Sequence, residues 1–177
     1  MEAVLKAYMA LETEVQKTIS GLFGNICALC TSTCCTPDIC EESCDSAFLR
    51  LVRTNNSSDV TFCERFGWLT ERGCALQYGR PPVCYGFFCN EILDALSDHD
   101  RETIRVLGRL ISWVGERAIG SQHLVEPTDD DTLARIKIDH VFTRIAVASE
   151  ALQGVRAALR HESVSEASRH AMQRILN

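Results

Sequence analysis

The sequence predicts a mainly α-helical protein: an antiparallel helical bundle with an irregular, cysteine-rich metal-binding module between its first helix and its C-terminal helices. Two observations support this fold class. Apolar residues recur every three or four positions at both ends of the 177-residue chain. All ten cysteines lie between Cys27 and Cys89, where that periodicity is lost. We therefore expect an N-terminal helix over 1–24, the cysteine-rich module over 25–90 and a helical bundle over 91–177.

The first segment has one mostly apolar helical face, which should join the C-terminal helices in a single bundle. Gly21 and Gly24 are expected to end this helix, because glycine is common just after a helix C-terminus. The face comprises Val4, Tyr8, Leu11, Val15, Thr18 and Leu22.

A short helix is expected to begin at Thr36 and Pro37 and to run through Leu51, since proline is favoured in the first helical turn. In such a helix Cys40 and Cys44 are four residues apart and lie on one face.

Two further local features are expected before the C-terminal helices. Residues 55–59, with the sequence NNSSD, have the composition of a loop. Residues 62–76 predict a small hairpin that turns at or before Gly73.

Three helices are predicted after residue 90. Ser97 or Asp98 can cap the first, Thr128 and the acidic run 129–131 should open the second, and the last should cover 163–176. The apolar positions of the first are Ile104, Leu107, Ile111, Val114 and Ala118; those of the second are Ile138, Val141, Ile145, Ala148, Leu152, Val155 and Leu159. This second seam could pack within the chain or against another copy, so a homodimer is an alternative.

Composition and charge exclude several classes of protein. The net charge is −6 and neither half of the chain is basic, so the electrostatic footprint of a nucleic-acid-binding protein is missing. Glu2, Lys6, Glu12 and Glu14 interrupt any apolar core of a secretory signal. No later segment is long and apolar enough to span a bilayer. We therefore expect a cytoplasmic protein that binds neither nucleic acid nor membrane.

Five cysteines fall within the fourteen residues from Cys27 to Cys40. Cytoplasmic thiols are normally kept reduced, so this density favours metal ligation over structural disulfides. Cys27 and Cys30 have the two-residue spacing of a chelating pair. Cys34 and Cys35 are adjacent, and adjacent side chains in extended backbone point apart, which favours two metal centres or one polynuclear cluster.

The second half of the candidate site contains Cys74, Cys84 and Cys89. Two prolines, beginning at Pro81, stiffen the chain before Cys84 and lower the entropy lost on ligation. Tyr85 and the phenylalanines that follow it are expected to cover Cys84 and Cys89 with apolar surface.

In this order and spacing the cysteines resemble the YkgJ-type cysteine-cluster family, whose members are described as zinc- or iron-chelating proteins with eight cysteines. The resemblance covers residues 27–89 and includes the family's Arg-Pro pair, here Arg80 and Pro81. It implies metal ligation by Cys27, Cys30, Cys34, Cys35, Cys63, Cys74, Cys84 and Cys89.

Two features depart from the family pattern. Three residues rather than two separate the first cysteine pair from the doublet. Cys40 and Cys44 are extra, either as additional ligands or as thiols without metal. Near the metal, Arg80 is a candidate donor of hydrogen bonds to cluster sulfurs. The alternative for this arginine is a salt bridge with Glu71 or Asp38.

Sulfur ligands exclude calcium and magnesium, which prefer oxygen, and leave iron–sulfur clusters and zinc as the chief candidates. The resemblance favours an iron–sulfur cluster, with zinc as the alternative. We expect a metal-binding protein that serves an unidentified protein partner in electron transfer, redox sensing or metal handling.

Two other functions stay open. Some proteins with this cysteine pattern are flagellin lysine methylases, so a metal-dependent protein-modifying enzyme is one alternative. A pocket with perturbed carboxylates beside the cluster would favour it. The other alternative is a zinc-stapled protein-interaction module.

Overall fold

The chain is described by a computed structural model. The described residues are 1–29, 36–55, 61–70 and 73–177, with side chains for all of these except 25–29.

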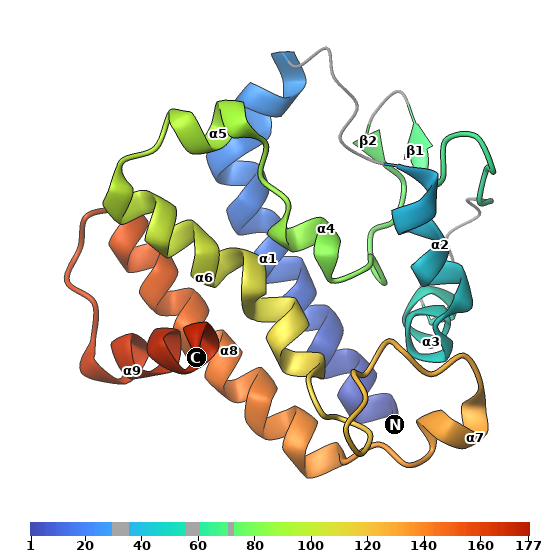
Figure 1. The fold of residues 1–177 in the computed structure, drawn as a ribbon. Helices are drawn as coiled ribbons and strands as arrows, with labels where there is room; N and C mark the ends of the chain where they lie inside the picture. The colour runs from blue at the N-terminus through green and yellow to red at the C-terminus, as the bar shows by residue number, and fades with distance from the viewer. Residues whose placement is uncertain (30–35, 56–60, 71–72) are drawn as a thin grey trace.

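Long helices pack side by side and make the protein mainly α-helical, which confirms the predicted fold class (Figure 1). They are α1 (Glu2–Leu29), α6 (Asp98–Gly115), α8 (Ile138–Leu159) and α9 (Glu166–Leu176). Shorter elements lie along the described chain between them: α2 (Pro37–Asp45), α3 (Ala47–Thr54), β1 (Leu69–Thr70), β2 (Gly73–Cys74), α4 (Val83–Gly86), α5 (Asn90–Asp94) and α7 (Asp130–Leu133).

Helix α1 is longer than predicted, because it passes through Gly21 and Gly24 and ends at Leu29. Both glycines are exposed, and a Cβ atom at either would meet nothing within 4 Å. A glycine inside a helix costs about 1 kcal/mol relative to alanine, which tertiary packing readily overrides. The continued helix buries Phe23, whereas Leu22 is exposed.

The helix predicted from Thr36 to Leu51 is in fact two helices. Its start is confirmed, with Thr36 as the N-cap and Pro37 in the first turn of α2. At Ser46 the backbone becomes extended, and the Ser46 hydroxyl accepts a hydrogen bond from the Leu49 amide at 3.2 Å. This serine therefore caps a new helix, α3, instead of continuing the old one.

The predicted hairpin is confirmed. Leu69 in β1 pairs with Cys74 in β2, and Thr70 pairs with Gly73. Gly73 has a φ of +98°, a conformation that favours glycine. Most of the predicted loop 55–59 lies outside the described residues.

The C-terminal helices differ from the prediction in three places: the short helix α5 precedes α6, the acidic run does not open α8, and α9 begins at Glu166 rather than at 163. Ser97 caps α6 as predicted, but the acidic run opens only the short helix α7, with Asp129 as its N-cap. Helix α8 begins afresh at Ile138. The Lys137 amide donates a hydrogen bond to the Ala118 carbonyl at 2.9 Å, and this tertiary contact takes the backbone out of the helical path.

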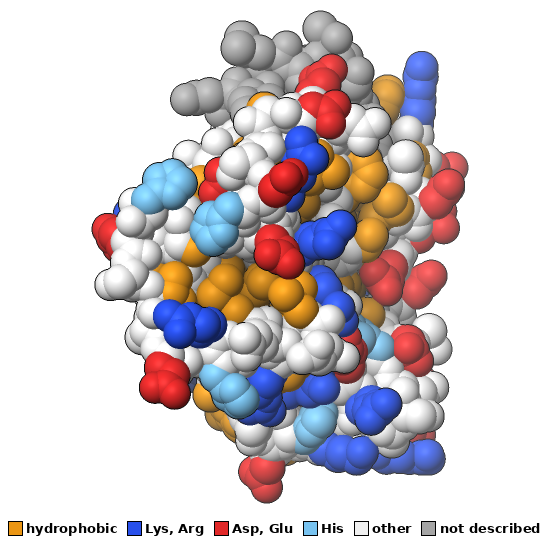
Figure 2. Space-filling view, turned by 60° about the vertical axis from the view of Figure 1, so that its left-hand side comes forward, with side chains coloured by type: hydrophobic (Ala, Val, Ile, Leu, Met, Phe, Trp, Pro, Cys, Tyr) orange, Lys and Arg blue, Asp and Glu red, His pale blue; other side chains and the backbone are white. Residues whose placement is uncertain are grey.

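Most of the predicted α8 seam is buried inside this chain, although Ile138 at its start is exposed. Val141, Ala148 and Val155 are fully buried, and α8 packs on α1, α6 and α9. This face therefore gives no reason to expect a second copy. Acidic and basic side chains are interspersed, with apolar ones between them, on the face that Figure 2 shows. No described helix has the length and apolarity to cross a membrane.

Candidate metal centre

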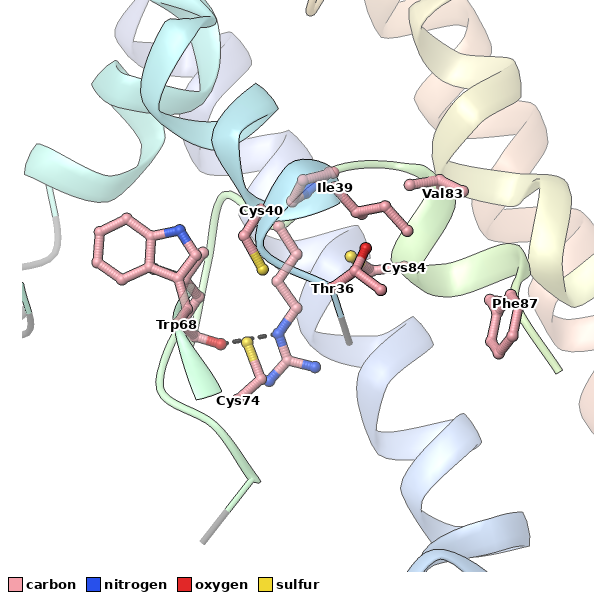
Figure 3. A pocket seen from close by; sticks show the side chains of 11 residues that line it. Thr36, Ile39, Cys40, Trp68, Cys74, Val83, Cys84 and Phe87 are labelled. Atoms are coloured by element: carbon pink, nitrogen blue, oxygen red, sulfur yellow. Dashed lines mark hydrogen bonds between the residues drawn. The ribbon is translucent and has the colours of Figure 1, made fainter. Parts of the chain in front are cut away.

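A cavity of about 150 Å³ lies between the start of α2, the hairpin and α4, and Cys40, Cys74 and Cys84 line it (Figure 3). The three cysteines come from three separate elements, α2, β2 and α4. The remaining wall is mostly apolar, and includes Ile39, Trp68, Leu76, Val83 and Phe87. The chain thus brings three thiols that are far apart in sequence to one small apolar cavity.

Cys40 is buried by close packing on the hairpin. A Cβ atom on Gly67 would lie 2.7 Å from the Cys40 Sγ atom, and Gly67 has a φ of +59°. The Trp68 indole N–H donates to the Ser43 hydroxyl at 2.7 Å, and that hydroxyl donates to the Cys40 carbonyl at 2.7 Å. The indole N–H, the hydroxyl and the carbonyl in this series of hydrogen bonds all have partners, and the series therefore holds the α2 side of the cavity in place.

Cys84 lies in the single turn of α4, which is anchored on α6. The Cys84 amide donates to the Pro81 carbonyl at 2.9 Å, so the two prolines lead directly into the turn. A Cβ atom on Gly108 of α6 would lie 2.9 Å from the Gly86 Cα atom. This backbone-to-backbone contact fixes the α4 side of the cavity against the helical bundle.

Arg80 is the charged residue in the cavity wall. Its Nε–H donates to the Leu76 carbonyl at 2.8 Å. Among the described residues Arg80 forms no ion pair with Asp38, and Glu71 lies outside them.

The other predicted ligands have different positions. Cys89 precedes α5 and packs on the main core, and Cys63 is exposed, its amide donating to the Gly67 carbonyl at 3.0 Å. Cys44 is half-buried beside the Cys40–Trp68 cluster. Cys27 lies in α1 but its side chain is outside the description, as are Cys30, Cys34 and Cys35 entirely. Within the described ranges, no three His, Cys, Asp or Glu residues lie close enough to hold an ion by themselves, and this includes Cys40, Cys74 and Cys84, which share a cavity wall without forming a complete ligand set.

Tyr85, predicted near the metal, does not line the cavity. It is buried, and its hydroxyl donates to the Glu12 carboxylate at 2.5 Å. Burial raises the pKa of Tyr85 well above its usual value, with a further contribution from the nearby Glu12 charge.

Glu12 is the functional candidate that the sequence reasoning missed. Its side chain is fully buried and accepts hydrogen bonds from the Gly79 amide at 3.1 Å, the Arg80 amide at 3.2 Å and the Tyr85 hydroxyl. Burial raises its pKa, and these hydrogen bonds oppose that effect only in part. A signal was present, because Glu12 interrupts the apolar face of α1 four residues after Tyr8 and three before Val15.

A second hollow of about 520 Å³ adjoins the cavity, with Val83 and Phe87 lining both. It contains Glu42, whose pKa is raised by burial and by the nearby Glu126 carboxylate. His123 also lines it. Its Nε2 atom lies 2.7 Å from the Ser112 carbonyl and its Nδ1 accepts from the Val125 amide, so both ring nitrogens already have partners.

Comparison with known proteins gives no match: no family model fits the sequence, and no curated protein or solved structure is significantly similar to the chain. The resemblance to YkgJ-type proteins stays a prediction.

Proposed function

We propose that this protein binds a metal centre through its cysteines and serves a protein partner in electron transfer, redox sensing or metal handling. One observation carries the proposal: Cys40, Cys74 and Cys84, from three separate elements, line one cavity. In a reducing compartment these three thiols would not form disulfides, so disulfide formation does not explain why they lie together. Metal binding gives a reason for their shared position.

The donor set suits a soft metal. Thiolates select zinc, copper(I) and iron–sulfur clusters over calcium and magnesium. Thr36 lines the same cavity and directly follows Cys34 and Cys35 in the sequence. Four thiolates suffice for one cluster, so these neighbours are our candidates to complete the set. The YkgJ-type resemblance, which is part of this proposal, includes the same doublet.

An iron–sulfur cluster is favoured over a single zinc ion. In a tetrahedral zinc site the sulfurs lie about 2.3 Å from the ion and enclose it without spare volume. The cavity of about 150 Å³ is about ten times the roughly 10–15 Å³ of such volume that one water molecule needs. Arg80 would balance part of the negative charge of a thiolate-bound cluster, and the apolar wall would shield it from solvent.

Val83 and Phe87 suggest where a partner would approach. Val83 is 48% exposed and Phe87 is 56% exposed, although both line the cysteine cavity. Apolar side chains exposed beside a redox centre are suited to brief contact with another protein. We assign the protein to the reducing cytoplasm as part of this proposal.

A metal-dependent protein-modifying enzyme is the second candidate. The adjoining hollow supports it, because Glu42 there has a pKa raised by burial and by the Glu126 carboxylate, and carboxylates perturbed in this way are common at catalytic sites. The zinc-stapled protein-interaction module is the third candidate. Zinc-loaded protein with no redox activity would favour it.

The test is anaerobic purification of the full chain, followed by an absorption spectrum and by iron, zinc and acid-labile sulfide analysis of one sample. Iron with sulfide and a band bleached by dithionite would support the cluster, and stoichiometric zinc would support the zinc alternative. Protein that is folded but free of metal after anaerobic reconstitution would refute the proposal.

Matched cysteine variants locate the centre. Cys40→Ser, Cys74→Ser and Cys84→Ser should each lose metal, whereas Cys44→Ser, next to the cavity but outside its wall, should keep it. Cys63→Ser and Cys89→Ser test the ligands implied by the resemblance. Full metal retention by Cys84→Ser, with unchanged melting, would remove Cys84 from the ligand set.

A further inference from the structure

We propose that Glu12 is a positioning residue for the metal centre. Its buried carboxylate holds the loop of residues 75–82, which connects β2 to α4, carries Arg80 and leads to Cys84. This inference rests on the proposed function, because it assumes that the cysteine cavity binds metal. Glu12 lies in α1, 68 residues before Arg80.

The carboxylate engages the loop with both oxygens. Oε2 accepts from the Gly79 amide at 3.1 Å, and Oε1 accepts from the Arg80 amide at 3.2 Å and from the Tyr85 hydroxyl at 2.5 Å. One turn later in α1, the Gln16 amide group donates to the Gln77 carbonyl at 2.9 Å and to the Tyr85 hydroxyl at 3.0 Å. Two successive turns of α1 therefore bind the loop by hydrogen bonds, and both also bind Tyr85 just after it.

The loop has little freedom to find another position. Gly79 has a φ of +73°, and a Cβ atom there would lie 2.8 Å from the Arg53 side chain and 3.0 Å from the Leu49 carbonyl. The loop is thus enclosed between α1 and α3. Its amides at positions 79 and 80 have the Glu12 carboxylate as acceptor, so the conformation of the loop depends on that one side chain.

This loop and the α4 turn after it build a large part of the cavity wall: the loop contributes Leu76, Arg80 and Pro81, and α4 contributes Val83 and Cys84. Arg80 is tied twice, by its amide to Glu12 and by its Nε–H to the Leu76 carbonyl, and this directs its guanidinium to the cavity. Tyr85 is tied to Glu12, and its neighbour Cys84 lies on the exposed side of the same turn. Fixing Tyr85 therefore fixes Cys84.

Burying a carboxylate completely costs free energy, whereas an apolar residue at the same core position would pack without that cost. The charged and titratable groups that face it are Tyr8 on its own helix, Tyr85 on α4 and Arg80 on the loop. Arg80 contributes only attraction at a distance, and no described side-chain cation bonds directly to Glu12. The carboxylate fits a role as acceptor for the loop rather than as half of an ion pair.

The test compares metal-loaded full-length Glu12→Gln with the wild type. A glutamine is isosteric, but its amide donors would face the N–H and O–H donors of the loop. We expect metal transfer to a chromophoric chelator to become about tenfold faster, as is typical when a group that orients metal ligands is changed. We also expect an altered visible circular dichroism spectrum of the bound centre, measured on the cobalt(II)-substituted protein if the native metal is zinc.

Val4→Ala is the matched control. Val4 is fully buried in the main core near the start of α1, two turns before Glu12, so this variant should lose stability while keeping the wild-type release rate and spectrum. If Glu12→Gln does not fold, Tyr85→Phe takes its place, since it removes one hydroxyl and keeps the ring. Wild-type release and spectrum in the folded variant would overturn the inference. A wild type that never binds metal would instead refute the proposed function itself.

Discussion

The Gly86 Cα atom lies directly against Gly108, so that α4, which carries Cys84, touches α6 backbone to backbone. A Cβ atom on Gly108 would lie 2.9 Å from the Gly86 Cα atom and 3.1 Å from the Phe88 ring. The α4 turn therefore sits at a distance from the bundle that depends on a missing side chain.

Gly108→Ala should push α4 away from α6. Overpacking of this kind costs about 1–3 kcal/mol in the free energy of unfolding, and it should also reduce metal binding through Cys84. Urea unfolding and metal analysis of the same variant would measure both effects. Gly21→Ala is the control, because Gly21 is exposed within α1 with open space around it. That variant should gain up to about 1 kcal/mol.

The stability of the metal-free protein should fall with rising pH through the titration of Glu12. Its pKa is raised above the usual value of a glutamate in the folded chain, mainly by burial. The folded state then binds the proton more tightly than the unfolded state. The Glu12 contribution to stability is therefore complete below the unfolded pKa and is lost as the pH rises through the folded pKa. Urea titrations of wild type and Glu12→Gln from pH 4 to pH 8 would measure this difference. Parallel curves for the two proteins would contradict the assignment.

Removal of the metal should lower the melting temperature of the wild type. At a free metal concentration about 100 times the Kd, binding adds about 2.7 kcal/mol, which for a chain of this size shifts the melting temperature by about 5–11 °C. Cys84→Ser should melt at the same temperature with and without chelator. An equal chelator effect on both proteins would mean that Cys84 is not a ligand.

Arg156→Ala should loosen the contact between α1 and α8. The guanidinium donates to the Thr18 hydroxyl at 3.0 Å, to the Glu14 carbonyl at 3.0 Å and to the Glu14 carboxylate at 2.8 Å. Loss of these partly buried bonds should cost about 1–2 kcal/mol in thermal or urea unfolding. Arg160→Ala removes an exposed ion pair with Glu162 and should leave stability unchanged within error. Equal losses in both variants would show that burial does not distinguish the two arginines.

Local signals in the sequence predicted the helices well. Ile104, Leu107, Ile111 and Val114 of α6 are all fully buried, as their three-four spacing predicted. The helix starts at Thr36-Pro37 and at Ser97 were recognisable because a helix start depends on residues within one turn of itself. Helix periodicity and caps are properties of neighbours along the chain, so the sequence contains them directly.

The boundaries that the prediction missed depend on contacts from elsewhere in the chain. Gly21 and Gly24 remain helical because Phe23 packs into the core and meets the Phe88 ring, with 5.6 Å between the ring centres. The start of α8 depends on the hydrogen bond between Lys137 and Ala118. Neither contact can be inferred from residues close in sequence, because each joins segments that meet only after folding.

The sequence by itself determined the helical class, most helical faces and the presence of a dense cysteine segment. The tertiary structure decided which described cysteines share a cavity, namely Cys40, Cys74 and Cys84. It also decided that Glu12 meets Tyr85, 73 residues further along the chain. The physical reason is the same in both cases. Periodicity specifies which side of a helix is buried, whereas the partner of a buried thiol or carboxylate is set by how separate elements pack against one another.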